Sequence, residues 1–191
     1  MRKRCLRQLA ITLLVCWLAG PAIAADPPDP QLVELLRNAA TEADSFADQF
    51  DAQVWLTDMS ARLTRQVTDP QERLTILKNV HYEAKRADLP PELVLAVIDV
   101  ESNFDRFAIS RVGARGLMQI MPFWLDEIGR PDDNLMHIHT NLRFGCTILK
   151  YYLDMENGDL IRALGRYNGS LGKRRYPNKV LDKLRLKWYR M

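Results

Sequence analysis

Residues 93–124 read LVLAVIDVESNFDRFAISRVGARGLMQIMPFW, and their pattern decides how the rest of the chain is interpreted. An apolar run leads to Glu101, and a polar segment with two glycines then closes on Met-Gln-Ile-Met-Pro. The β-branched residues of the run would suit a buried strand, but no neighbouring strand candidate exists to pair with it, and Pro90 and Pro91 suit the first turn of a helix. We therefore predict a helix, buried on nearly all sides, that carries Glu101 at its C-terminal end.

This position has chemical consequences for Glu101. Desolvation against an apolar wall and the negative end of the helix dipole both favour the protonated carboxyl. An acid that stays neutral near neutral pH can donate a proton to a leaving group. Gly113 and Gly116 permit tight turns and close backbone approach, and Gln119 offers a donor and an acceptor beside flexible methionines. The pattern is consistent with a cleft for a sugar, but also with a solvated glutamate beside a packed turn.

Three short motifs narrow this choice. Residues 101–102 read Glu-Ser, residues 110–122 read SRVGARGLMQIMP, and residues 166–168 read RYN. In order and spacing they closely resemble the motifs of the soluble lytic transglycosylase (SLT domain) family within the lysozyme-like superfamily, where the third motif is Ala-Tyr-Asn. The resemblance extends over roughly residues 80–190. It implies an all-α, lysozyme-like fold.

The resemblance also implies an activity. Such enzymes cleave the β-1,4 bond between N-acetylmuramic acid and N-acetylglucosamine and leave a 1,6-anhydromuramic acid end without using water. Glu101 would protonate the glycosidic oxygen, and the substrate's N-acetyl group would stabilise the cationic centre. Glu101 would then accept the proton of the C6 hydroxyl as that oxygen attacks C1. This scheme uses one carboxylate, whereas most glycosidases use two.

Further roles carry over by resemblance, motif by motif. Beside the catalytic Glu101, the residues expected to line the glycan cleft and bind substrate are Ser110, Gln119, Met121 and Tyr167. Tyr167 is also expected to reach the catalytic carboxylate. The residues expected to hold these loops in place are Ser102, Gly116, Met118 and Asn168. Two departures leave substrate register and product size open: Arg166 replaces the family's alanine, and residues 169–181 (GSLGKRRYPNKVL) are short and basic.

Two other acids lie close to Glu101 in sequence. Asp99 is two residues earlier, so on a helix it points elsewhere, and we expect it to be paired rather than catalytic. Asp105 lies beyond the expected helix end and is the candidate for a second catalytic carboxylate, which a hydrolytic lysozyme would need. A non-catalytic module that binds peptidoglycan or a secretion apparatus is the remaining alternative, although intact Glu101, Gln119 and Tyr167 favour an enzyme.

The N-terminus resembles a secretion signal. Residues 1–24 combine a basic leader, an apolar run at 9–19 that is too short to span a bilayer, and a small-x-small site at 22–24. We therefore predict a cleaved signal peptide, with an uncleaved anchor as the alternative, and export across the inner membrane to a periplasmic, cell-wall-associated location. The remainder is divided into a helical N-terminal extension at 25–79 and an SLT catalytic domain at 80–191.

Charge and composition limit the partners. The chain is 191 residues long, 47% hydrophobic and 27% charged, as expected of one folded domain. Its net charge is +3, but the leader holds four basic residues and no acid, which leaves −1 for the rest and gives no argument for nucleic acid. Residues 166–191 hold nine Lys or Arg against Asp182 alone, which suits an anionic polymer, a membrane surface or a solvated helix face.

Apolar spacing predicts helices in several further segments. These are residues 31–67, as one helix or two, and residues 70–89, 141–157, 159–168 and 177–190. Asp69 and Pro70 suit the start of the second of them. The acidic segment 31–67 lies outside the resemblance and could dock a cell-envelope protein, while the expected substrate is peptidoglycan glycan strands and the expected state is a monomer.

No metal or cofactor is expected. After cleavage of the leader, Cys146 is the sole cysteine, so no intrachain disulfide can form, and its apolar helical setting predicts a buried, unreactive side chain. His81, His137 and His139 lack the spacing that would place them on one face as ligands.

Overall fold

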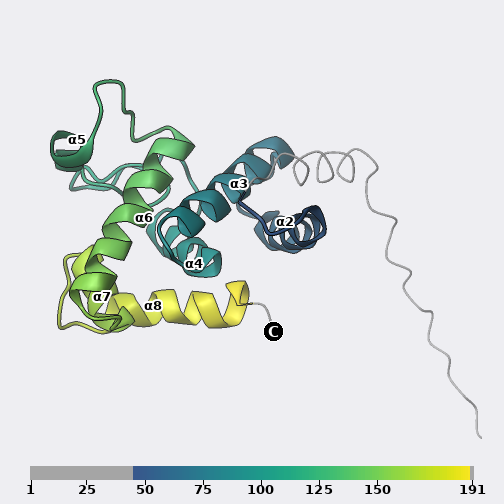
Figure 1. The fold of residues 1–191 in the computed structure, drawn as a ribbon. Coiled ribbons are helices and arrows are strands. Elements are labelled where there is room, and N and C mark those ends of the chain that lie inside the picture. The colour runs from purple at the N-terminus through teal and green to yellow at the C-terminus, as the bar shows by residue number, and fades with distance from the viewer. Residues whose placement is uncertain (1–44, 190–191) are drawn as a thin grey trace, which may run out of the picture.

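The computed structural model describes residues 45–189 (Figure 1). The helices are α2 (Gln49–Leu63), α3 (Pro70–Arg86), α4 (Pro91–Glu101), α5 (Phe123–Ile128), α6 (Ile138–Met155), α7 (Leu160–Tyr167), α8 (Arg175–Lys183) and a π-helical turn, η1 (Leu184–Trp188). Within this range β pairing is limited to isolated bridges that join Ile109, Arg115 and Ile120. The predicted all-α fold is confirmed. The predicted signal peptide and the first part of segment 31–67 lie outside the described residues.

Local sequence explains where the central helices begin. The Asp69 carboxylate accepts a hydrogen bond from Gln71 N–H (3.0 Å) and Pro70 occupies the first turn, so α3 starts as its sequence predicts. Pro91 likewise starts α4, and every residue from Leu93 to Asp99 is buried. The expectation of a helix surrounded by apolar side chains is therefore confirmed, and the alternative of a buried strand is wrong.

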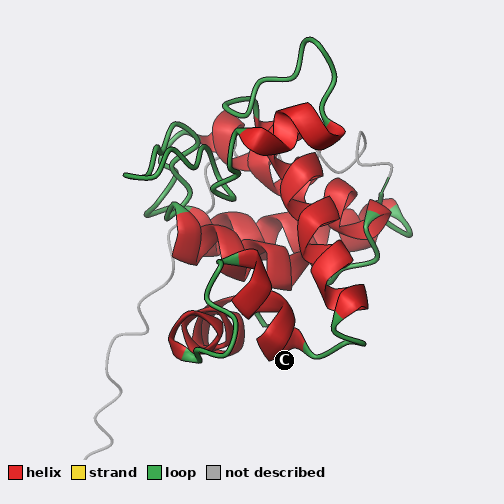
Figure 2. Cartoon of the chain, turned by 90° about the vertical axis from the view of Figure 1, so that its left-hand side faces the viewer, coloured by secondary structure: helices red, strands yellow, loops and turns green. Residues whose placement is uncertain are grey.

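Helix α4 lies at the centre of the packing. It contacts α3 on one side and α8 with η1 on another, while α6 packs on α3 and α7 joins α6 to α8. Figure 1 shows α8 along one edge of the bundle and α5 set apart on a long loop. The cartoon in Figure 2 shows the loops that connect the helices extending from a helical core.

The described part of the N-terminal extension belongs to the same core. Helix α2 packs on α3, and its side chains Leu56 and Met59 are fully buried among those of the following helices. The predicted boundary between residues 79 and 80 falls inside α3. Within residues 45–189, no helix is long and apolar enough to cross a membrane.

One ion-pair cluster ties α8 and η1 to α4. The buried carboxylate of Asp99 lies 2.6 Å from Lys183 Nζ and 2.9 Å from Lys187 Nζ, and it accepts a hydrogen bond from the indole of Trp188 (3.1 Å). Burial raises the pKa of Asp99, but hydrogen bonds and charge from Lys183 and Lys187 outweigh it and hold the pKa below its ordinary value. Asp99 is paired, as expected, and it faces away from Glu101's cleft.

Replacing Asp99 by alanine should therefore loosen the contact between α8 and α4. We expect Asp99→Ala to lower the free energy of unfolding by about 2 kcal/mol at pH 7, because both lysines lose their partner but can still turn toward water. The ion pairs of Asp99 stabilise the folded protein above the ordinary carboxyl pKa of 3.8, and this stabilisation is lost as the pH falls through the lowered folded-state pKa. The difference in stability between wild type and Asp99→Ala should therefore shrink in acid. Urea unfolding at several pH values measures it. Asp182→Ala, which removes an exposed carboxylate on α8, should leave stability unchanged.

Candidate active site

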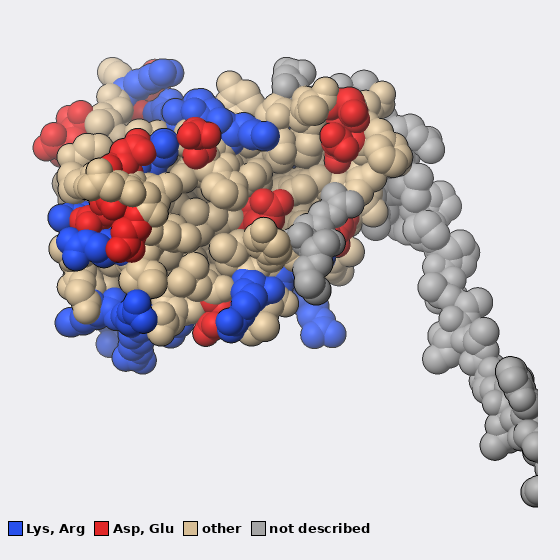
Figure 3. Space-filling view, turned by 60° about the horizontal axis from the view of Figure 1, so that its bottom comes forward, with Lys and Arg blue, Asp and Glu red and all other residues tan. Residues whose placement is uncertain are grey.

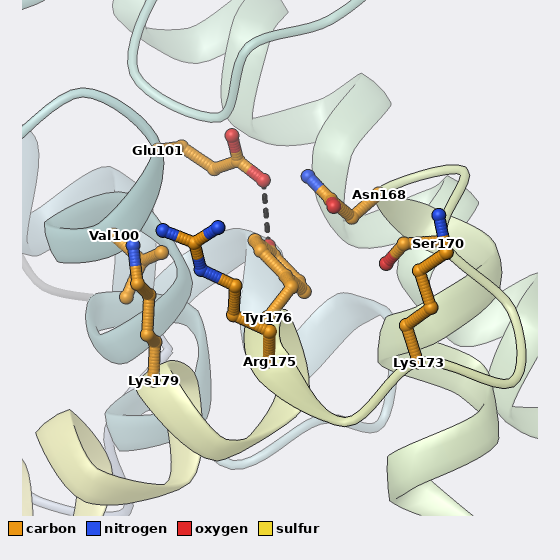
Figure 4. Close-up of a pocket in the computed structure, with 8 residues that line it drawn as sticks. All are labelled: Val100, Glu101, Asn168, Ser170, Lys173, Arg175, Tyr176 and Lys179. Carbon is orange, nitrogen blue, oxygen red and sulfur yellow. Dashed lines mark hydrogen bonds between the residues drawn. The ribbon is translucent and has the colours of Figure 1, made fainter.

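Glu101 ends α4 at the junction of two cavities. The first, about 320 Å³, is called here the α8 arm and is lined by Val100, Glu101, Asn168, Ser170, Lys173, Arg175, Tyr176 and Lys179 (Figure 4). The second, about 240 Å³, is the loop arm, lined by Glu101, Ser110, Val112, Ala114, Gln119, Ile120, Met121, Trp124, Ile148, Tyr167 and Asn168. Glu101 and Asn168 line both arms, so the two cavities adjoin at this carboxyl.

The environment of Glu101 favours its protonated form near neutral pH. Burial raises its pKa to about 7, although a hydrogen bond from the Tyr176 hydroxyl to Oε1 (2.6 Å) acts in the opposite direction. Burial and the nearby Glu101 also raise the pKa of Tyr176 well above its ordinary value, so the phenol remains a donor. Glu101 can therefore both give and take a proton at neutral pH.

The chain turns sharply just after Glu101. Asn103 and Phe104 adopt left-handed φ values of 50° and 69°. The Ser102 hydroxyl donates to the carbonyl of Leu117 (2.8 Å) and accepts from the N–H of Phe104 (3.2 Å), which ties the end of α4 to the glycine-bearing loop. Ser102 thus links the last turn of α4 to this loop. Strained backbone of this kind concentrates at functional sites.

Asn141 of α6 fixes the glycine-bearing loop from the other side. Its side chain donates to the carbonyls of Arg115 and Leu135 (both 2.8 Å) and accepts from the N–H of Met118 (2.8 Å). Gly116 has φ 74°, and a Cβ there would lie 2.3 Å from Asn141 Nδ2, so glycine is required for both reasons. Asn141 was not singled out from the sequence, because nothing local distinguishes it from any other asparagine on a helix.

The residues predicted to bind substrate from the loop lie together in the loop arm. Gln119 has φ 51°, and its Nε2 donates to the carbonyls of Gly116 (2.9 Å) and Ala108 (3.2 Å), which leaves its side-chain oxygen as an acceptor. The Ser110 hydroxyl accepts from Ala114 N–H (3.0 Å), and Met121 lines the same arm. This arm presents polar atoms beside apolar surface, which suits the faces of a sugar ring.

The two tyrosines of the site differ from the sequence expectation. Tyr167 lines the loop arm, but its hydroxyl donates to the carbonyl of Met118 (2.8 Å). The tyrosine that donates to Glu101 is Tyr176, at the start of α8. Met118 is fully buried and lines neither arm, whereas Asn168 lines both. Tyr176 was missed because only the packing of α8 on α4 brings it to Glu101.

Glu101 is the one carboxylate that lines either arm among the residues described. Asp105 lines neither arm, and its carboxylate accepts a hydrogen bond from the N–H of Phe107 (2.9 Å) in a local turn. In the same part of the chain, no cluster of three or more His, Cys, Asp or Glu could hold a metal ion. Cys146 is fully buried, as predicted, and burial raises the pKa of its thiol above the ordinary value.

Comparison with known proteins identifies the family. The sequence profile of the family described as the transglycosylase SLT domain matches residues 78–185. The chain belongs to this family. A protein named "Transglycosylase" from Enterobacteria phage PRD1 is 33% identical over 106 residues, which are 52% of this chain and 39% of the phage protein. The chain thus spans about two fifths of that relative's length.

A solved structure is also similar. It is an X-ray structure of an inactive mutant of lytic transglycosylase Slt from Pseudomonas aeruginosa, with a TM-score of 0.45 and 24% identity, covering 85% of this chain and 32% of that chain. The family profile and the phage relative, independently of this structure, confirm the resemblance to the SLT family that the motifs indicated.

The two tyrosines offer a matched test of the site's electrostatics. Tyr176→Phe removes the donor that stabilises ionised Glu101, so the pKa of Glu101 should rise above about 7. Tyr167→Phe removes a hydroxyl that donates elsewhere and should leave that pKa nearly unchanged. Titration of the Glu101 carboxyl by NMR measures both. An equal shift in the two variants would contradict the assignment of Tyr176 as the partner.

The raised pKa also predicts a cost in stability. The folded protein binds the Glu101 proton more tightly than the unfolded chain, so this group's contribution is most favourable below pH 4.5 and declines as the pH rises toward 7. Glu101→Gln removes the titration and should stabilise the protein at pH 8 by up to about 3 kcal/mol, with no gain at pH 4. Unfolding experiments at both pH values measure the difference. Glu127→Gln, at an exposed site on α5, should show no such dependence.

Proposed function

We propose that this protein is a peptidoglycan lytic transglycosylase that cleaves the bond between N-acetylmuramic acid and N-acetylglucosamine without water. The observation that carries the proposal is Glu101: a carboxyl in the middle of a two-armed cleft, with a pKa of about 7 and no second carboxylate lining either arm in the described chain. Membership of the SLT family supports this substrate class.

In the first step, protonated Glu101 gives its proton to the glycosidic oxygen, and the bond from C1 to that oxygen breaks. The departing sugar leaves with a free hydroxyl group at C4. The cationic C1 that remains is stabilised by the substrate's own N-acetyl group, since no protein carboxylate lines the cleft to take that role. The Tyr176 hydroxyl stabilises the carboxylate that forms on Glu101.

In the second step, ionised Glu101 acts as a base. It takes the proton of the C6 hydroxyl as that oxygen attacks C1, which closes the 1,6-anhydro ring and restores the acid. A pKa near 7 suits both steps, because the driving forces for giving and taking the proton are then balanced. Gln119 and Ser110 would orient the sugar in the loop arm, and Met121 and Trp124 would pack against its apolar faces.

The cellular setting follows from the substrate. Peptidoglycan lies outside the cytoplasmic membrane, and the signal peptide predicted at residues 1–24 would deliver the protein there. We propose a periplasmic, wall-associated enzyme. Segment 31–67, of which residues 45–67 are described, is proposed as a contact for a cell-envelope protein.

Mass spectrometry of muropeptides released from purified sacculi tests the reaction. We expect products that end in 1,6-anhydromuramic acid, and Glu101→Gln should reduce their release by about a thousandfold, because it removes the proton donor and base together. Asp105→Asn should retain activity, since that carboxylate lies outside the cleft. Reducing ends in place of anhydro ends would show hydrolysis by water and would overturn the single-acid scheme.

A further inference from the structure

The α8 arm differs from the loop arm in charge. It is lined by three basic side chains, Lys173, Arg175 and Lys179, and by Glu101 as its one acid. The loop arm contains no basic residue. The two arms meet at Glu101, so the described cleft is cationic on one side of the reacting carboxyl and uncharged on the other.

The three cations have no counter-charge from residues 45–189. None of them forms an ion pair with a residue that the structure describes, although nearby basic residues do: Lys183 and Lys187 pair with Asp99, and Arg166 pairs with Glu156. Figure 4 shows Arg175 and Lys179 near Val100 and Lys173 near Ser170, with Tyr176 between them. Unpaired cations around a cavity are a site for anionic ligand groups.

Neutral donors add to this arm. The Ser170 hydroxyl is buried and has no hydrogen-bond partner within residues 45–189, and the Asn168 side chain points into the cavity beside it. Buried hydroxyl groups are normally satisfied, so an unsatisfied one in a cavity wall indicates a missing partner. Figure 3, which brings the α8 edge forward, shows further Lys and Arg side chains interspersed with acids on this face.

We propose that the α8 arm binds the carboxylates of a peptide stem carried by the muramic acid next to the scissile bond, so that the protein prefers stem-bearing strands over bare glycan. This inference rests on the proposed function, which supplies the glycan. In an intact strand the lactyl carboxyl of muramic acid is held in the amide bond that carries the stem, so carboxylates of the stem are the charged groups that these cations would meet. A cavity of about 320 Å³ accommodates the first residues of such a stem.

The test compares two substrates and three proteins. Purified glycan strands are used with their stems intact and after enzymatic removal of the stems, followed by conversion of the exposed lactyl carboxyl groups to amides. Wild type is compared with Lys173→Gln/Arg175→Gln/Lys179→Gln and with a matched control, Arg65→Gln/Lys85→Gln/Arg130→Gln, which removes three exposed charges that line neither arm. The readouts are kcat/KM for glycosidic cleavage and, in a Glu101→Gln background, the affinity for each strand.

We expect wild type and control to prefer stem-bearing strands by about tenfold in both readouts, and the preference to fall as salt is added. The α8-arm variant should lose this preference in both readouts and treat the two strands alike. Equal use of both strands by wild type, or an unchanged preference in the α8-arm variant, would overturn the inference.

The binding readout separates this inference from the proposed function. If wild type cleaves neither strand, the proposed enzyme activity fails. A tenfold preference in affinity that depends on the three cations would then still support the stem site, and equal affinity for both strands would overturn it as well.

Discussion

The packing of α8 against the last turn of α4 controls the electrostatics of the whole site. Two carboxyl groups lie two residues apart on α4, and α8 supplies the partner of each. Lys183 and the neighbouring Lys187 neutralise Asp99, whereas Tyr176 gives Glu101 a hydrogen bond but no charge. A buried carboxyl with a cation beside it stays ionised, and one without a cation holds its proton. The opposite pKa shifts of Asp99 and Glu101 therefore have a common structural origin.

This arrangement also explains how an unfavourable site can persist in a folded protein. A pKa raised from 4.5 to about 7 means that ionised Glu101 opposes folding by roughly 3 kcal/mol at alkaline pH. The ion pairs of Asp99 lie at the same contact between α4 and α8, and they stabilise the folded state. They fix α8 at its C-terminal end, and Tyr176 at the other end is thereby held against Glu101 without needing a charge of its own.

Much of this could be predicted from sequence, because it depends on local patterns. Prolines and a capping aspartate fix the starts of α3 and α4, an unbroken apolar run marks α4 as central, and the glycine-bearing motif after Glu101 is contiguous in sequence. Tyr176 and Asn141 could not be found in this way. Each acts on a segment more than 20 residues away, and its role exists only once α8 or α6 has packed. The domain boundary expected at 79/80 lies inside α3, since motif resemblance follows the site and not the helix.

The asymmetry of the cleft has a consequence for how a strand would lie in it. The loop arm offers hydrogen-bonding groups and apolar side chains but no basic residue, so it would distinguish poorly between glycan registers in the proposed enzyme. The cationic α8 arm can distinguish these registers, because only a sugar with an anionic substituent gains from it. Alternate sugars of the strand carry such substituents, so a shift by one sugar would move the charge away from Lys173, Arg175 and Lys179. The α8 arm would then set the register of the strand, and with it which of two chemically similar bonds faces Glu101. The loop arm would supply the binding surface that both registers share.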